Sequence, residues 1–176
     1  MTPSASSFGS PEPAYDSGLV MAMASVPTDA MLPVGSAFKP PHEADVFWFP
    51  TDQEPTPNDR WLKANFPTGK DCVDGFRSAF ALYVSDGCGR EMRDKLLSEL
   101  TGRKLEQFRS DGWLPFLICD RIYINAQAGV IVFKCQPHID YNLEEHGVEV
   151  SLRGGKWHFG YIGDSMDYFD YWQNGG

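Results

Sequence analysis

The sequence predicts a single α+β domain in which one or two helices pack against an antiparallel sheet of about four to six strands. Composition and two kinds of periodicity support this class. The 176 residues are 42% hydrophobic and 22% charged, which is ordinary for a globular protein. One segment repeats its apolar residues at helical spacing, and the C-terminal half contains short segments in which apolar and polar residues alternate. These patterns indicate one sheet and a small helical layer.

Strand patterns recur in the C-terminal half and follow one another closely enough to form an antiparallel meander. In the segment 148–152 the alternation predicts that Glu149 and Ser151 face outward. Gly154-Gly155 suits the hairpin between the last two strands, because both central residues of such a tight turn need a positive φ. The predicted strands are 121–125, 129–136, 148–152 and 156–162.

The clearest helix pattern covers residues 89–100. We expect Gly102 to end this helix in a left-handed conformation, after which Leu105 and Phe108 continue into a second short helical turn. Residues 76–84 fit strand and helix patterns about equally, and the Asp-Gly pair that follows them favours a strand. The apolar residues of the amphipathic helix are Met92, Leu96, Leu97 and Leu100.

The N-terminal residues 1–41 are rich in Pro, Ser and Ala and show no sustained period of 2 or 3.6. They predict a flexible tail, because so little apolar burial does not offset the entropy of ordering the chain. The single α+β domain is then expected over residues 42–176. Its first element is a short edge strand over 46–49, which Pro50 terminates.

Charge narrows the expected partners and location. Acidic residues outnumber Lys and Arg by 24 to 15, a net charge of -9. This balance repels phosphates, so we expect no nucleic-acid partner, and a basic protein is the favoured partner. The ordinary composition predicts no membrane association. The N-terminal stretch lacks the positive charge of an export signal, which favours a cytoplasmic location.

The cysteines predict buried thiols and not a metal or redox site. Their spacings of 16, 31 and 16 residues contain no Cys-x-x-Cys pair. No cofactor is therefore expected. The four positions are Cys72, Cys88, Cys119 and Cys135.

The segment 138–147 holds the densest group of ionisable side chains and leaves several interpretations open. One is a zinc site, with three donors converging across the loop, which would make the chain a metal-dependent or acid-base hydrolase. The spacing is not the HExxH helix pattern, so we expect no metal. Otherwise Glu144, Glu145 and His146 fix the loop by hydrogen bonds or contact a partner. The zinc donors of the first interpretation are His138, Asp140 and His146.

Carboxylates alternate with large rings near the C-terminus. From residue 140 onward there are seven acidic residues against two basic ones, a balance of -5. These rings either cover the sheet or form an acidic, aromatic docking surface, in which rings supply contact area and carboxylates select a basic partner. The predicted partner-binding residues here are Asp164, Asp167, Tyr168, Asp170 and Trp172.

The segment 133–162 also carries a family resemblance. Phe-Lys-Cys, the turn Asp-Tyr-Asn-Leu-Glu-Glu-His-Gly-Val and the later Arg-Gly-Gly-Lys hairpin resemble a bacterial domain of unknown function found near polymorphic-toxin genes. Glu145, His146 and Gly147 match its Glu-His-Gly turn, whereas its usual Trp is missing between Gln136 and Tyr141. The resemblance implies an immunity-type protein that binds and blocks a toxin.

The expected function is thus that of a non-enzymatic, acidic protein-binding module. By resemblance it is an immunity protein that neutralises a basic toxin or effector domain, and no catalytic residue is predicted. Two alternatives stay open. One is the hydrolase centred on the segment 138–146, and the other is a structural component of a phage or secretion system.

Overall fold

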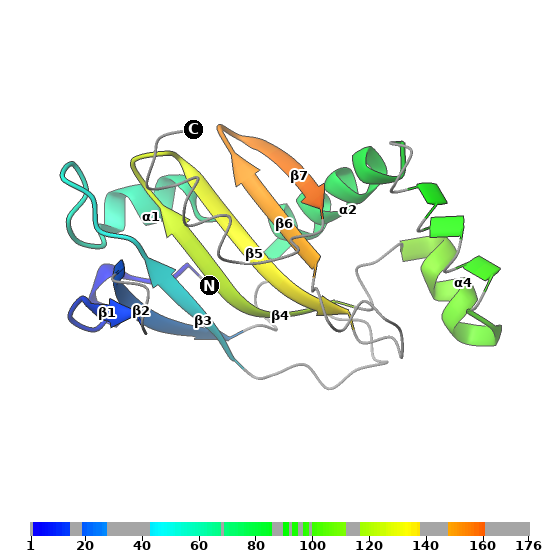
Figure 1. Cartoon of the computed structure of the whole chain (residues 1–176), viewed down its shortest axis with the longest axis horizontal. Coiled ribbons are helices and arrows are strands. Elements are labelled where there is room, and N and C mark those ends of the chain that lie inside the picture. The colour runs from blue at the N-terminus through cyan, green and yellow to red at the C-terminus, as the bar shows by residue number, and fades with distance from the viewer. Residues whose placement is uncertain are drawn as a thin grey trace.

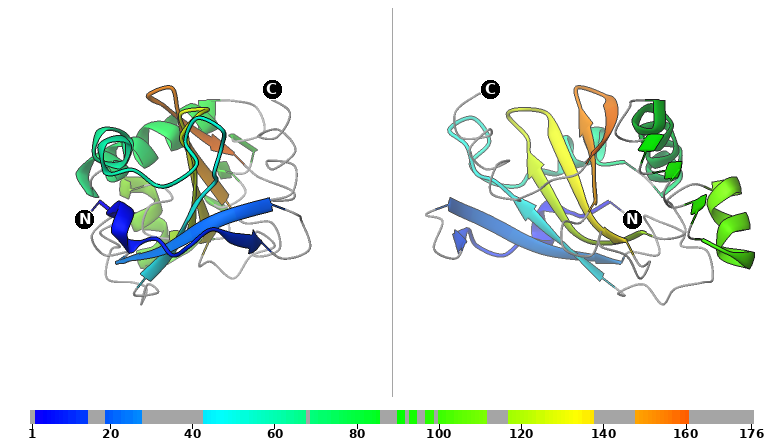
Figure 2. Two further views of the ribbon diagram at one scale, coloured as in Figure 1. Left: turned by 90° about the vertical axis from the view of Figure 1, so that its left-hand side faces the viewer. Right: turned by 45° about the vertical axis from the view of Figure 1, so that its right-hand side comes forward.

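The protein folds around one sheet with helices on one of its faces (Figures 1 and 2). The computed structural model describes residues 2–14, 19–27, 43–67, 69–85, 90–91, 93–94, 97–98, 100–111, 117–137 and 148–160. Strands that follow one another in sequence are also neighbours in the sheet. The strands are β1 (Glu12–Ala14), β2 (Leu19–Pro27), β3 (Glu43–Trp48), β4 (Leu117–Asn125), β5 (Val130–Pro137), β6 (Val148–Arg153) and β7 (Lys156–Gly160).

The α+β prediction is confirmed, and the sheet has seven strands, one more than the upper end of the expected range. Neighbouring strands are antiparallel, except that β3 runs parallel to β4. A parallel pair requires a long crossover connection, and the helices of the chain lie in it. They are α1 (Asp59–Asn65), α2 (Gly69–Ser85) and α4 (Gly102–Asp111), and a short 3-10 helix η1 (Ala5–Ser7) precedes β1.

The helices are not distributed evenly around the sheet. Helices α1 and α2 cover one face, while α4 lies at the end of the molecule opposite β1 (Figures 1 and 2). Within the described ranges, no helix combines the length and the apolar character that crossing a membrane requires.

The core lies between the sheet and helices α1 and α2. Trp48, Ile122 and Phe133 of the sheet are fully buried together with Leu62 of α1. Phe76 of α2 meets Phe133 edge to face, with ring centroids 5.5 Å apart. Aromatic pairs in this geometry add to the stabilisation that comes from burial alone.

The strand predicted over residues 76–84 is wrong, because these residues belong to α2. Cys72, Phe76 and Ala79 are buried and lie at i, i+4 and i+7, so they form one face of a helix against the sheet. Gly75 lies beside them, and a Cβ at this position would overlap the indole ring of Trp157 on β7. A glycine here lets the helix backbone approach the sheet closely.

The flexible tail predicted over residues 1–41 is wrong for β2, which pairs with β3 along six residues. Ala22, Ala24 and Val26 alternate on the core side of β2 and are at most 5% exposed. Small side chains are sufficient here, because Ala22 lies directly opposite Trp48 and the large ring fills the space. With β2 beside it, β3 is an inner strand, so the predicted edge position is also wrong.

The four-strand meander of the C-terminal half is confirmed as β4 to β7. Strand β4 begins earlier than predicted and contains an irregularity of register between Cys119 and Arg121. Gly154 and Gly155 form the predicted hairpin, with φ of 53° and 76°. Glycine adopts two successive values of this kind without the steric cost that a Cβ would bring.

The helix expected over residues 89–100 is helical at each position that the structure describes between 90 and 98. Gly102 has a φ of 56°, which confirms the predicted left-handed conformation. Leu105 and Phe108 then lie in α4, which is longer than the short turn expected there. Leu100 and Phe108 are buried and join the main core.

We call the sheet face that points away from α1 and α2 the second face. In register across it lie Asp45 of β3, Arg121 of β4, Lys134 of β5 and Glu149 of β6. The prediction that Glu149 and Ser151 face outward is wrong, because they are 5% and 3% exposed. Alternation assigns residues to opposite faces of a strand, but it does not tell whether both faces are covered.

Candidate binding surface

The residues that the sequence singles out for function lie outside the described residues. This applies to every position of the segment 138–147 and of the segment 161–176, so the partner-binding and zinc-binding hypotheses remain predictions. Within the part of the chain that the structure describes, no three His, Cys, Asp or Glu side chains gather to hold a metal ion. The predicted residues concerned are His138, Asp140, Glu144, Glu145, His146, Asp164, Asp167, Tyr168, Asp170 and Trp172.

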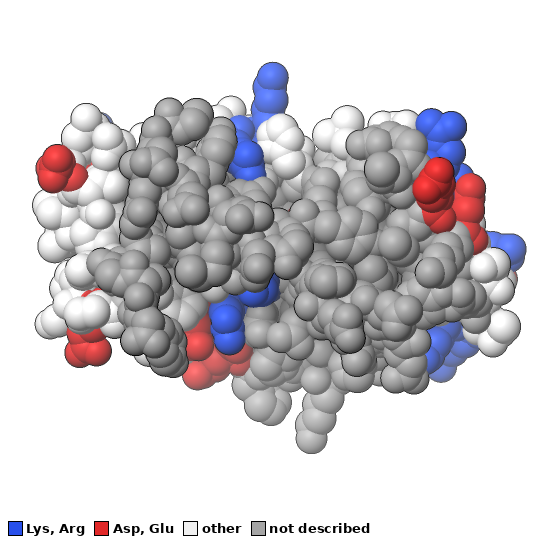
Figure 3. Space-filling view, viewed as in Figure 1, with Lys and Arg blue, Asp and Glu red and all other residues white. Residues whose placement is uncertain are grey.

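The described residues instead reveal an acidic surface at the β1 end of the sheet. From residue 2 to residue 59 they include six acidic side chains and neither Lys nor Arg. Figure 3 shows acidic atoms predominating at this left-hand end, whereas acidic and basic atoms mix at the right-hand end. We call this surface the acidic edge. Its carboxylates are Glu12, Glu43, Asp45, Asp52, Glu54 and Asp59.

The loop between β3 and α1 carries two of these carboxylates, Asp52 and Glu54. The carbonyl of Glu54 accepts a hydrogen bond from Trp48 Nε1 at 3.3 Å, and its backbone N–H donates to Thr51 Oγ1 at 3.0 Å. Asn58 caps α1 by accepting from the N–H of Trp61 at 2.6 Å. Asn58 Nδ2 also donates to Glu54 Oε2, so the position of the Glu54 carboxylate is set by the helix cap.

Exposed apolar side chains accompany the carboxylates. Met23 and Val20 on β2 are 52% and 44% exposed, and Met23 lies directly opposite Phe47. Phe47 in turn stacks on Tyr123 of β4, with ring centroids 5.2 Å apart and planes inclined by 20°. Thioether and aromatic groups of this kind are typical contact residues of protein interfaces. The acidic edge therefore combines charge with apolar contact area.

A polar row runs beside this apolar row on the second face. Ser25 of β2 donates a hydrogen bond from Oγ to Asp45 Oδ1 at 3.2 Å, and Asp45 lies in register with Arg121 of β4. Asp45 and Glu43 project from the same side of β3, since they are two positions apart. These two carboxylates lie opposite Pro27 and Ser25 of β2, on the same face as Met23.

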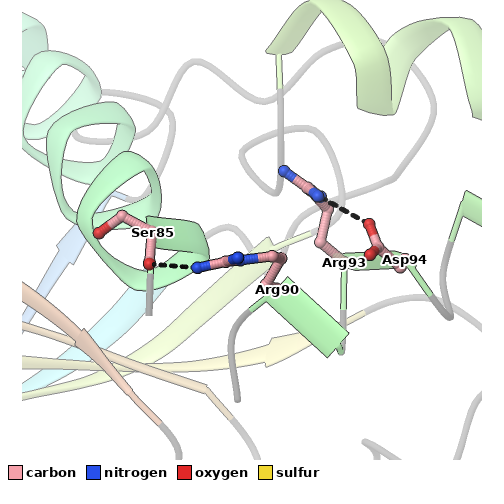
Figure 4. A network of polar contacts seen from close by, with 4 residues as sticks. All are labelled: Ser85, Arg90, Arg93 and Asp94. Atoms are coloured by element: carbon pink, nitrogen blue, oxygen red, sulfur yellow. Dashed lines mark hydrogen bonds and ion pairs between the residues drawn. The ribbon is translucent and has the colours of Figure 1, made fainter. Parts of the chain in front are cut away.

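The opposite end of the molecule has a different charge pattern. There Arg93 binds the neighbouring Asp94 through Nε and Nη2 at 3.0 and 2.7 Å, and Arg90 donates to the carbonyl of Ser85 at 3.0 Å (Figure 4). On α4, Arg109 pairs with Glu106 at 3.2 Å. Because charges of both signs compensate one another here, this end offers no single-sign surface.

Glu149 is a buried carboxyl group on the second face. Its Oε2 is buried, and none of the described residues donates a hydrogen bond to it. Burial raises the pKa of Glu149 to about 7, and the positive charges of Lys134 and Arg153 oppose this rise only in part. A buried carboxyl without full pairing favours its neutral form. The side chain therefore takes up a proton near neutral pH.

The buried thiols are confirmed at Cys72, Cys119 and Cys135, and Cys88 lies outside the described residues. Burial, followed by the nearby Cys119 and Asp71, raises the pKa of Cys72 to about 12. Such a thiol is neutral at physiological pH and therefore a poor nucleophile.

The comparisons with known proteins add no relative. No protein-family model matches the chain, and no match is found among curated proteins or among solved structures.

The sequence did contain a signal for the acidic edge that the pattern of strands and helices does not reveal. Residues 1–59 contain eight acidic residues and a single lysine, Lys39, a balance of -7 within a chain of net charge -9. That imbalance exceeds the one at the C-terminus. Interpreting this region as a tail concealed its relevance, because charge on a tail does not define a surface.

Proposed function

We propose that the chain is an acidic protein-binding module that captures a basic partner at its acidic edge. The observation that carries the proposal is the combination of an exposed Met23 with six carboxylates among the described residues 2–59, which outnumber the nearby basic residues Arg60, Lys63 and Arg121. Surfaces on which one charge sign predominates, with apolar groups between the charges, are suited to selecting an oppositely charged protein. With the resemblance to immunity-type domains, this supports neutralisation of a basic toxin or effector as the biological role.

Binding at this surface would act by occlusion. Long-range attraction by the carboxylates accelerates encounter with a basic protein, and it weakens as salt is added. Met23 and the stacked pair of Phe47 and Tyr123 then supply area that slows dissociation. The acidic residues predicted near the C-terminus would add to the same attraction.

Charge reversal in matched pairs tests this function. Calorimetry would compare the unaltered chain, the variant Glu12→Lys with Glu43→Lys, and a control with Glu91→Lys and Glu106→Lys, against a basic effector domain encoded beside the gene. All four positions are exposed, and the two control positions lie in the mixed-charge end. We expect the acidic-edge variant to lose at least about tenfold in affinity while the control changes by less than about threefold.

The control separates position from net charge, because both double variants change the total charge equally. Equal losses in the two variants, or no binding by the unaltered chain, would count against the acidic edge as the docking surface. If the acidic-edge variant alone binds more weakly than the unaltered chain, and this difference in affinity disappears at high salt, the result would support the acidic edge as the docking surface.

A further inference from the structure

Strand β2 has a backbone edge that is only partly paired. Strand β1 pairs with it over Leu19, Val20 and Met21, and β2 continues to Pro27. Figures 1 and 2 show β2 extending well past β1 along the edge of the sheet. The next outward group is the carbonyl of Met23, which accepts a hydrogen bond from the N–H of Gly9 at 2.9 Å. This contact marks which backbone groups of β2 point away from β3.

Ser25 carries the open position on that edge. Backbone groups of residues two apart in a strand point to the same side, so the N–H and C=O of Ser25 point outward like those of Met23. Within the described ranges, neither group of Ser25 has a backbone partner. The side chain of Ser25 is exposed as well. Unpaired backbone groups on an edge strand are a template for an additional strand.

The charge around this edge decides which strand fits. A second copy of the chain would bring one acidic edge against another and place Glu43 and Asp45 near their own counterparts. Like charges across such an interface are unfavourable. In a strand added to β2, Lys or Arg side chains on the second face would instead lie one strand away from Glu43 and Asp45. Long cationic side chains can span this separation.

We propose that the partner adds a strand to β2 at residues 23–27, and that this strand alternates Lys or Arg with apolar residues. This inference rests on the proposed function and specifies its binding mode. Main-chain hydrogen bonds to Ser25 provide affinity, and the alternating cations on the second face provide selectivity for the acidic edge. The apolar residues of the added strand then lie beside Ala24 and Val26, which face the core.

Three synthetic peptides of about ten residues test the binding mode on the full chain. The first alternates Lys with Val and Thr. The second has the same side chains but is N-methylated at alternate residues, so it lacks half of its backbone donors. The third has Glu in place of Lys. The affinity of each peptide and the hydrogen-exchange rate of the Ser25 amide, measured by NMR, are the two readouts.

We expect the Lys peptide to slow exchange of the Ser25 amide by at least about tenfold, and the N-methylated twin and the Glu peptide to bind at least about tenfold more weakly. Equal binding of the Lys peptide and its N-methylated twin, or unchanged exchange at Ser25, would overturn strand addition and leave the proposed function standing. Equal binding of the Lys and Glu peptides would overturn the preference for basic partners, and with it the proposed function. No binding of the Lys peptide would overturn strand addition.

Two substitutions at one position complete the test. Ser25→Pro removes the outward N–H without breaking a backbone bond to β3, whereas Ser25→Ala keeps the N–H. Both substitutions remove the hydroxyl that binds Asp45, so they differ in the backbone donor. We expect the Pro variant to bind the Lys peptide at least about tenfold more weakly, with the Ala variant within about threefold of the unaltered chain. Similar affinities for the two variants would contradict a main-chain role. The peptide measurements on the unaltered chain decide the question if the Pro variant fails to fold.

Discussion

The two faces of the sheet are buried by different chemistry. On the face toward α1 and α2 the sheet presents apolar residues such as Ile122, Phe133 and Val150, and each of them meets other apolar groups. On the second face of the same strands lie Lys134, Glu149 and Arg121 in register. Glu149 is nevertheless as inaccessible as much of the core. Burial on the second face is therefore accompanied by an electrostatic cost that the helix face does not have.

On a single strand, burial on one face stabilises the fold while burial on the other face destabilises it. Val150 and Glu149 are neighbours on β6, and both are buried, but only Glu149 leaves a polar atom without a donor among the described residues. Removing an apolar group from water stabilises the fold, while removing an incompletely paired carboxylate destabilises it. Substitutions on the two faces should therefore change the free energy of unfolding in opposite directions and by different amounts.

The largest expected effect concerns thiols on the helix face. Cys72, Cys119 and Cys135 are buried, and the raised pKa of Cys72 keeps its thiol neutral. Because a reagent reaches them only when the structure opens, we expect native-state modification to be at least about a thousandfold slower than in the unfolded chain. Peptide mapping by mass spectrometry after timed alkylation, with and without denaturant, gives the rate at each cysteine. Fast labelling of Cys72 under native conditions would show that the helix face is not closed.

The second effect concerns the pH dependence that the second face imposes. The pKa of Glu149 rises from an ordinary value of 4.5 to about 7, so the folded state keeps a proton that the unfolded state releases. The stability contribution of the neutral form is complete below about 4.5 and is lost as the pH rises through about 7. We expect Glu149→Gln to remove this loss, making the variant more stable than the unaltered chain at pH 8 by on the order of 3 kcal/mol.

Urea unfolding at pH 5 and pH 8 measures the effect, and the difference between the two proteins isolates Glu149 from other titrating groups. Glu106→Gln on α4 is the matched control, because its carboxylate is exposed. A Gln variant that loses as much stability as the unaltered chain between the two pH values would show that Glu149 is fully paired when ionised.

The third effect tests how closely the helix face is packed. Gly75→Ala places a methyl group where the ring of Trp157 lies, and this ring is itself fixed by stacking on Phe133 at 5.7 Å. We expect a loss of about 2 kcal/mol or more in the free energy of unfolding, although alanine favours helix by about 1 kcal/mol. Chemical denaturation measures the loss, with the exposed substitution Ser78→Ala in the same helix as the control.

A double-variant cycle identifies the cause. In a Trp157→Leu background the clash is absent, so Gly75→Ala should be neutral or stabilising by up to about 1 kcal/mol. The same loss in both backgrounds would mean that the ring is not the obstacle and that α2 does not approach β7 as closely as described.

The sequence was informative about the fold wherever one period dominated. The strands β4 to β7 and the hairpin at Gly154-Gly155 were predicted, because alternation and glycine φ preferences are local properties. Residues 76–84 were misassigned, since their apolar residues fit both periods and only packing against Phe133 selects the helix. Strand β2 was missed because its buried residues are mostly alanines, which look unremarkable until Trp48 lies opposite.

The candidate site was less predictable than the fold for a related reason. A count of charges along the sequence does not say which charges are close in space. Strand pairing determines which of them form one surface. Glu12, Glu43 and Asp45 become one surface only once β1, β2 and β3 are paired. The C-terminal acidic residues favoured by the sequence lie outside the described residues, so their role stays a prediction.

The smallest expected effect provides the baseline for the charge on the second face. Asp94 is also a carboxylate beside an arginine, but its side chain is 60% exposed and bonds Arg93 at 2.7 Å. Water already solvates both charges, so Asp94→Asn should change the free energy of unfolding by less than about 0.5 kcal/mol. Urea unfolding of this variant, run beside Glu149→Gln, compares the same carboxylate-to-amide change in two environments. If the two variants shifted stability equally, burial on the second face would not be what distinguishes Glu149, and the contrast between the faces would fail.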